Sequence, residues 1–185
     1  MDRIYIYEGN FEKGEKGNLL IKRAAESFCR ETGSEHWNDN EIVRQEGGKP
    51  FFKNSRLKFS LSHSGLLWMC MVSTDECGLD VQIVKDCDYE KMAERYFKPS
   101  EQHYVKLWGE SGFFDLWVRK EAFGKCTGEG IFSEMPSFTD ENADLINHFF
   151  YKEQEYFIRG IDIADDIKCA VCSVGRIEIE TRLLG

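Results

Sequence analysis

The sequence predicts an α+β protein made of two similar halves. Its strand-like and helix-like segments follow the order strand, helix, strands, and then strand, helices, strands. The composition, with 42% hydrophobic and 14% aromatic residues, is that of a folded protein, and only 3 prolines in 185 residues are available to form a linker. We therefore expect one compact unit whose halves are residues 1–75 and 76–185, joined near Thr74 to Glu76.

The first half contains a strand, a helix and a hairpin. The segment RIYIYEG alternates as a strand does, and apolar residues from about Lys16 to Glu31 then recur at the helical period before Gly33. A polar, irregular stretch ending in GGKP leads to two strand-like runs, LKFSLSHSG and LLWMCMVS. Because a Ser-Gly turn lies between these runs, they predict a β-hairpin.

The second half opens with the strand-like run CGLDVQIV. Helical patterns follow in DYEKMAERYF, PSEQHYVKLWG and SGFFDLWVRKEAFGKC. Ser111 can cap the start of the last of these helices, and Gly128 and Gly130 follow its end. The runs HFFYKE, EYFIRGID, IKCAVCSV and IEIETRL then predict strands, so this half places its helices between strands.

Charge and cysteine content limit the function classes. The formal net charge of -9 disfavours broad binding to nucleic acid or to an anionic membrane, since both need a large cationic surface. We find no signal-peptide pattern and no apolar run near the ~20 residues that cross a bilayer, so we expect a cytoplasmic protein. Seven scattered cysteines favour reduced thiols. Cys169 and Cys172 form one Cys-x-x-Cys, but in a strand their thiols point to opposite faces, which argues against a shared metal.

A strand and a helix carry candidate functional residues. In GLDVQIV, the period of two places Asp80 and Gln82 on one face of the strand. In FFDLWVRKEAFGKC, Glu121 and Lys125 share one stripe of the helix with Trp117, whereas Lys120 is turned roughly 100° away. Each of these residues also has an explanation without function. Asp80 could be a solvated residue of a strand, and Glu121 and Lys125 could form an ordinary Glu-Lys pair on an exposed helix.

Two further segments could contact phosphate. In FSLSHSG, His63 lies where a strand enters a turn, and its imidazole and the nearby backbone amides could bind a phosphate oxygen. In GGKP, Lys49 follows Gly48 and is held extended by Pro50, which could bring a cation and the backbone close to a ligand. A structural histidine and a solvated lysine are the alternatives.

The order and type of these segments resemble one family. FSLSHSG, CGLDVQ and FFDLWVRKEAFGKCTGEG are similar to the signature of the 4'-phosphopantetheinyl transferases of the surfactin-synthetase-activating type, and the last segment contains the whole F-x-x-x-W-x-x-K-E-x-x-x-K-x-x-G pattern. GGKPFF and RYFKPSE also resemble elements of that family. The resemblance extends from about Gly47 to Gly130.

The resemblance implies an enzyme that moves the phosphopantetheine arm of coenzyme A onto a serine of an acyl or peptidyl carrier protein, releasing adenosine 3',5'-bisphosphate. By similarity, Asp80, Glu121 and Lys125 are catalytic: Glu121 takes the serine proton and Lys125 steadies a phosphate. Asp80 and Glu121, with Gln82, hold Mg²⁺.

The resemblance also assigns coenzyme A binding and a fold. Gly48, Lys49 and Pro50 hold the nucleotide end. His63, with Ser62 beside it, contacts a phosphate, as Lys125 does. The larger members of the family fold as two similar α+β halves related by a pseudo-twofold, with the site between them. A monomer is expected, because the trimers of the family belong to its short synthase type.

The sequence departs from the family at two places. Gln82 stands where many members have a glutamate as a further metal ligand, so weaker metal affinity or a water at that position is expected. The early basic residues that bind the 3'-phosphate have no clear match, and Lys13, Lys16 and Arg23 are the candidates. Two alternatives remain: a catalytically impaired relative that binds coenzyme A or a carrier protein, and a metal-dependent phosphodiesterase with an Asp-Glu site.

Overall fold

The computed structural model describes residues 2–11, 15–34, 36–38, 40–44, 48–131 and 134–184, and for residues 15 and 16 only the backbone. The strands of the first half are β1 (Asp2–Glu8), β2 (Ile42–Arg44), β3 (Pro50–Phe52), β4 (Lys58–Ser64) and β5 (Leu67–Ser73), with the helix α1 (Glu15–Thr32). The second half has β6 (Cys77–Ile83), α2 (Tyr89–Tyr96), α3 (Pro99–Thr127), β7 (His148–Tyr151), β8 (Gln154–Gly160), β9 (Ile167–Ser173) and β10 (Ile179–Leu183). The predicted α+β class is confirmed.

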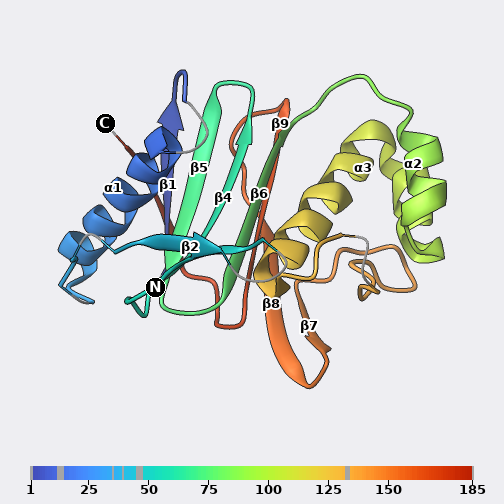
Figure 1. Cartoon of the computed structure of the whole chain (residues 1–185). Helices are drawn as coiled ribbons and strands as arrows, with labels where there is room; N and C mark the ends of the chain where they lie inside the picture. The colour runs from blue at the N-terminus through green and yellow to red at the C-terminus, as the bar shows by residue number, and fades with distance from the viewer. Residues whose placement is uncertain are drawn as a thin grey trace.

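The first sheet has the strand order β10-β1-β5-β4 and is covered on one face by α1 (Figure 1). The predicted hairpin of β4 and β5 is formed, with Ser64 opposite Leu67 and Gly65 in the turn at φ +59. Along α1, Ile21, Ala25 and Phe28 pack in one cluster with apolar residues of β4 and β5. The helical period predicted from about Lys16 to Glu31 therefore corresponds to a face buried against this sheet.

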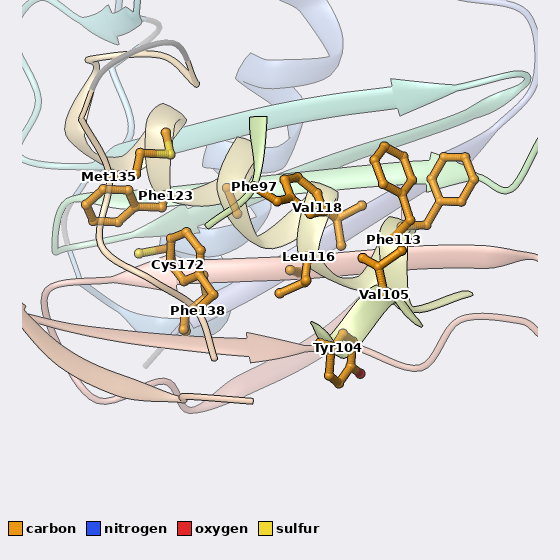
Figure 2. Packing of buried hydrophobic residues seen from close by; sticks show 14 of the residues in the cluster. Phe97, Tyr104, Val105, Phe113, Leu116, Val118, Phe123, Met135, Phe138 and Cys172 are labelled. Atoms are coloured by element: carbon orange, nitrogen blue, oxygen red, sulfur yellow. The ribbon is translucent and has the colours of Figure 1, made fainter. Parts of the chain in front are cut away.

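The second sheet has the order β6-β9-β8-β7 and carries α3 on one face. Figure 2 shows the core between the sheet and α3, where Phe123 of α3 and Phe138 of the segment that follows this helix pack near Cys172 of β9. Cys169, three residues earlier, lies in a different cluster, between the two sheets. The prediction that this Cys-x-x-Cys sends its thiols to opposite faces is confirmed.

The two sheets lie next to each other through their other faces. Ile4, Met69 and Met71 of the first sheet share a buried cluster with residues such as Leu79 and Val171 of the second. At the junction, β4 and β6 run side by side in the middle of the molecule (Figure 1). Each half therefore has a sheet between a long helix and the other sheet. The pseudo-twofold relation between the halves stays a prediction.

Two features of the fold differ from the sequence-based expectation, and the expected break in the long helix is confirmed. The stretch expected to be irregular contains the antiparallel pair β2 and β3. The two helices expected in residues 99–126 are both present within α3, on either side of a kink at Gly109, where the backbone is not helical (φ 60, ψ -142); Ser111 lies two residues after this kink. Gly109 has no Cβ and tolerates this conformation, which interrupts the helix between its two parts. Finally, β10 pairs in parallel with β1, so the end of the second range completes the sheet of the first, and the division at residue 75 stays a prediction.

No helix among the described residues has both the length and the apolar character needed to span a membrane.

Candidate active site

The strand β6 and the helix α3 bring the two candidate segments into direct contact. The Lys125 ammonium donates to Asp80 Oδ1 over 2.6 Å and to the Leu61 carbonyl over 3.3 Å. Asp80 is buried, whereas 31% of the Lys125 side chain is exposed. The strand period predicted which face of β6 carries Asp80, and the helix period predicted which stripe of α3 carries Lys125; the tertiary fold brings this face and this stripe together.

Gly78 allows this close packing. An added Cβ on Gly78 would lie 1.9 Å from the Ala122 carbonyl oxygen and 2.6 Å from the Cys126 amide nitrogen. The backbone of α3 therefore rests on the strand at a position that only glycine fits. Because Gly78 lies two residues before Asp80, this contact sets how near the helix can place its functional side chains to Asp80.

Serine side chains join β4 to β6 across the junction of the two sheets. Ser62 Oγ donates to Asp80 Oδ1 over 2.7 Å, and Ser60 Oγ accepts from the Leu79 amide over 2.9 Å. Ser64 Oγ accepts from the Ile83 amide over 3.0 Å. These serines alternate along one face of β4, so the segment FSLSHS supplies a polar edge that fixes β6 and orients Asp80. Sequence analysis selected Ser62 but missed Ser60 and Ser64.

Glu121 lies one helical turn before Lys125, and the charges of Asp80 and Lys125 both affect its pKa. Burial raises its pKa above the ordinary value, the negative charge of Asp80 raises it further, and the Lys125 ammonium opposes these effects in part. Two carboxyl groups thus lie close enough to interact, beside one cation. Their hard oxygen atoms suit a hard divalent cation, which often binds one or two protein carboxylates together with substrate phosphates. Among the described residues, no group of three or more His, Cys, Asp or Glu side chains is placed to hold a metal ion.

A cavity of about 320 Å³ opens beside these residues, between β4, the pair β2 and β3, and the last turns of α3. Glycines form much of the helix side of its wall, and Gly130 packs its backbone within 2.9 Å of a Cβ built on Gly124. The cavity can therefore accept a flat group against the backbone. Its lining consists of Arg44, Gly48, Lys49, Pro50, Phe59, Ser60, Leu61, Glu121, Gly124, Lys125, Gly128 and Gly130.

Lys49 lines this cavity but directs its ammonium to protein groups. Its Nζ donates to Glu76 Oε2 and to the Cys126 carbonyl, each over 2.8 Å. Burial alone would raise the pKa of Glu76, but the hydrogen bonds from Lys49 and Lys58 outweigh it and lower that pKa. A cation at the last carbonyls of α3 is also favoured by the helix dipole. Lys49 thus fixes the β2–β3 pair to the end of α3.

Gln82 and His63 lie at the edge of the cluster. The Gln82 amide nitrogen donates to the Ile83 carbonyl over 3.1 Å and to Ser64 Oγ over 3.4 Å, so neither bond uses its oxygen. His63 is exposed and contacts the ring of Phe11 at 5.0 Å. It shares a face of β4 with Leu61, which lines the cavity, and lies about 7 Å farther along the strand.

Of the candidates for a 3'-phosphate site, Arg23 has a side chain that the structure describes, and it does not line this cavity. Lys13 lies outside the described residues, as does the side chain of Lys16. Arg23 lines a separate hollow with Trp37. Among the described residues of the cavity wall, the cation that sequence analysis did not select is Arg44.

Lys120, next to Glu121 in the sequence, has a structural environment. Its Nζ lies 2.8 Å from Glu101 Oε2, and the two side chains are 7% and 0% exposed. Glu101 also accepts from the amides of Lys98 and Phe138, which holds the start of α3. The structure therefore separates the lysines of the helix motif: Lys120 lies in the interior and Lys125 at the site.

Comparisons with known proteins match this combination of segments. A family model described as the 4'-phosphopantetheinyl transferase superfamily matches residues 76–172. The 4'-phosphopantetheinyl transferase gsp of Aneurinibacillus migulanus is 29% identical over 74% of this chain and 60% of its own length. A 4'-phosphopantetheinyl transferase of Bacillus subtilis is 31% identical over 70% of this chain and 61% of its own length. The Sfp enzyme of Bacillus subtilis strain 168 is 26% identical over 74% of this chain and 64% of its own length. The chain thus spans between 60% and 64% of these relatives, and the resemblance seen in the motifs is confirmed.

Proposed function

This chain belongs to the 4'-phosphopantetheinyl transferase superfamily, and we propose that it transfers the 4'-phosphopantetheine arm of coenzyme A to a serine of an acyl or peptidyl carrier protein. The other product is adenosine 3',5'-bisphosphate. The contact between Lys125 and Asp80, beside Glu121 and the glycine-lined cavity, is the observation that carries the proposal. It joins the strand motif and the helix motif in one polar cluster. Asp80, Glu121 and Lys125 all come from one chain, which supports a monomer.

The proposed reaction is a phosphoryl transfer in which the carrier serine is the nucleophile. Its oxygen forms a bond to the phosphorus that bears the pantetheine arm, and the bridging bond from this phosphorus to the adenosine-side phosphate oxygen breaks. The serine proton goes to Glu121, and the electron pair of the broken bond stays on the leaving bisphosphate. Since little covalent work falls to the protein, its residues must position the reactants and offset the phosphate charge.

Glu121 suits the role of proton acceptor. Burial and the charge of Asp80 raise its pKa, so its ionised form is a stronger base than an exposed glutamate. Lys125, whose side chain reaches the cavity and is partly exposed, offers a cation for the leaving phosphate. Ser62 keeps Asp80 in place through its hydrogen bond.

The proposal includes Mg²⁺ held by Asp80 and Glu121. When bound, the ion would neutralise diphosphate oxygens and so favour attack by an alcohol. The hydrogen bonds of the Gln82 side chain leave its amide oxygen available. This oxygen is the candidate for a further neutral ligand of the ion or for a contact with a water bound to it. Gly48 and Pro50 would contact the nucleotide from the β2–β3 side of the cavity, with Lys49 holding this side in place. His63, which lies beyond Leu61 along β4, would contact a phosphate group.

One incubation tests the proposal. The protein is mixed with coenzyme A, Mg²⁺ and a panel of apo acyl and peptidyl carrier proteins, and the carriers are weighed by mass spectrometry. We expect one carrier to gain a single phosphopantetheine, and Glu121→Gln to abolish this gain while circular dichroism stays unchanged. No gain on any carrier would refute transfer. Cleavage of coenzyme A without a carrier would instead identify a phosphodiesterase.

A further inference from the structure

The α3 side of the cavity wall ends in a short segment of backbone, Gly128 to Gly130. Gly128 follows the helix in the left-handed conformation at φ +78, and Gly130 has φ +71. The amides of both glycines donate to the Gly124 carbonyl, over 2.9 Å and 3.3 Å. Among the described residues that line the cavity are Gly128 and Gly130 but not Glu129, which lies between them. The carboxylate of Glu129 is therefore directed elsewhere.

Glu129 is bound by the turn of the β7–β8 hairpin. Lys152 Nζ donates to Glu129 Oε1 over 2.8 Å, and the Tyr151 hydroxyl donates to Glu129 Oε2 over 3.0 Å. The same hydroxyl lies 2.8 Å from the Glu134 carbonyl oxygen, so it also contacts the chain five residues later. The hydrogen bond from Lys152 lowers the pKa of Glu129 more than burial raises it, and the bond from Tyr151 lowers this pKa further. Glu129 is thus an anion whose two oxygens are both bound by one turn.

The hairpin turn has contacts of its own that fix it beside α3. Lys152 and Glu153 form a two-residue loop between the paired residues Tyr151 and Gln154, with φ +47 and +65. A two-residue loop with positive φ at both positions matches the twist of the strands that it joins, so its direction is well defined. The Tyr151 ring packs edge-on against Phe123 of α3, with ring centroids 5.2 Å apart. The turn is therefore placed by the hairpin and the core, and it can act as a fixed point for Glu129.

The direction of the Glu129 side chain matters because the proposed substrate is an anion. Coenzyme A carries a diphosphate and one further phosphate. A carboxylate turned into the cavity from a point between two glycines of its wall would repel these groups, since like charges interact strongly in a partly buried site. Bound to Lys152, the same carboxylate points away from the cavity, and its charge is compensated.

We propose that Tyr151 and Lys152 are positioning residues for the binding of coenzyme A and that they act through Glu129. By binding this carboxylate, they keep its charge out of the cavity. They also hold Gly128 and Gly130 in place as the wall against which the substrate lies. The inference rests on the proposed function. Both residues act at a distance from the substrate, through the segment that they fix.

The proposal predicts an effect on substrate binding and not on the chemical step. Glu121 and Lys125 belong to the helical part of α3, before its end at Thr127. This part is packed on β6 through Gly78 and does not depend on the hairpin turn for its place. Loss of the contacts with Glu129 therefore leaves the reacting groups where they are, while the wall beyond the helix is released.

Kinetics separate this role from a general loss of structure. The double variant Tyr151→Phe/Lys152→Met keeps the ring and the alkyl chain but removes both groups that bind Glu129. We expect its KM for coenzyme A to rise about fivefold or more, with kcat within about twofold of the wild-type value. In a Glu129→Ala protein the same two substitutions should change KM by less than about twofold, because the group on which they act is gone. The matched control is Glu155→Gln, which breaks the ion pair with His148 on the face of the hairpin that points away from α3 and should leave KM unchanged.

Hydrogen exchange and calorimetry test the same contact without a carrier protein. In the double variant, the amides of Gly128 and Gly130 should exchange faster, while those of β6 and β9 keep their protection. Calorimetry should show coenzyme A binding weakened by the same factor as KM. Unchanged exchange, faster exchange throughout the second sheet, or a fall in kcat with KM unchanged would each overturn the inference. If the wild type transfers nothing to any carrier, the proposed function fails, while exchange and calorimetry still decide the role of Tyr151 and Lys152.

Discussion

Replacing Gly78 by alanine tests whether the packing of α3 on β6 sets the geometry of the site. The new Cβ would lie 1.9 Å from the Ala122 carbonyl oxygen, whereas ordinary contact begins near 3.4 Å, so the helix must move by about 1.5 Å. Ala122 follows Glu121 directly. A displacement of about 1 Å in a positioned group can cost roughly 100-fold in rate. We therefore expect Gly78→Ala to lower kcat/KM for transfer about 100-fold and the free energy of unfolding by about 1–3 kcal/mol.

Two measurements check this expectation, and a second glycine provides the control. Urea unfolding gives the stability change, and initial rates of phosphopantetheine transfer give the catalytic change. Gly160 lies in β8 of the same sheet, and a Cβ there would meet its nearest atoms at 3.8 Å, an ordinary contact. Gly160→Ala should leave the rate nearly unchanged. A Gly78→Ala protein with wild-type rate and stability would refute the idea that this contact positions Glu121 and Lys125.

Other substitutions test the charges around the site. Lys120→Met leaves the Glu101 carboxylate buried without its partner, so urea unfolding should show a loss of about 3–5 kcal/mol, and a loss below about 1 kcal/mol would contradict the structural role. Burial and the charge of Asp80 raise the pKa of Glu121, so the stability that this side chain contributes falls as the pH rises from its ordinary pKa of 4.5 through its raised pKa in the folded protein. Glu121→Gln should therefore be more stable than the wild type at pH 7 but not below pH 4.5. Thermal unfolding measured at several pH values checks this expectation. Gln82→Glu should lower the Mg²⁺ concentration that gives half the maximal transfer rate, and an unchanged midpoint would place Gln82 away from the ion.

Periodicity explains which parts of the site could be predicted. A strand alternates its faces and a helix repeats about every 3.6 residues, so the shared face of Asp80 and Gln82 and the shared stripe of Glu121 and Lys125 follow from spacing alone. The left-handed end of α3 at Gly128 also follows from residue type. These features are local, and no knowledge of the rest of the chain is needed to find them.

Contacts between distant segments could not be predicted in this way. Ser60 and Ser64 look like ordinary polar residues of a half-buried strand until β6 is placed beside β4. The parallel pairing of β10 with β1 joins the two ends of the chain, which no local pattern encodes. On a helical wheel Lys120 looks like a surface lysine, and only the fold shows that its partner, Glu101, is buried in the interior. In each case, the partner lies many residues away.

The ion pairs around the cavity explain why its lysines differ in availability. Lys49 is held by a carboxylate and a helix carbonyl, and only a small part of its side chain is exposed, so a ligand would have to displace protein groups to reach its charge. Lys125 has a carboxylate partner too, but its side chain is more exposed, and Asp80 keeps a second contact from Ser62 if Lys125 turns away. A charge that is already hydrogen-bonded in a dry site gains less from a new partner than one that is partly hydrated and mobile. The proposed contact with phosphate therefore has different physical support at the two residues. Lys125 is partly exposed, and Ser62 still binds Asp80 if Lys125 turns toward a phosphate. Lys49 contributes mainly by holding the β2–β3 wall of the cavity to the end of α3.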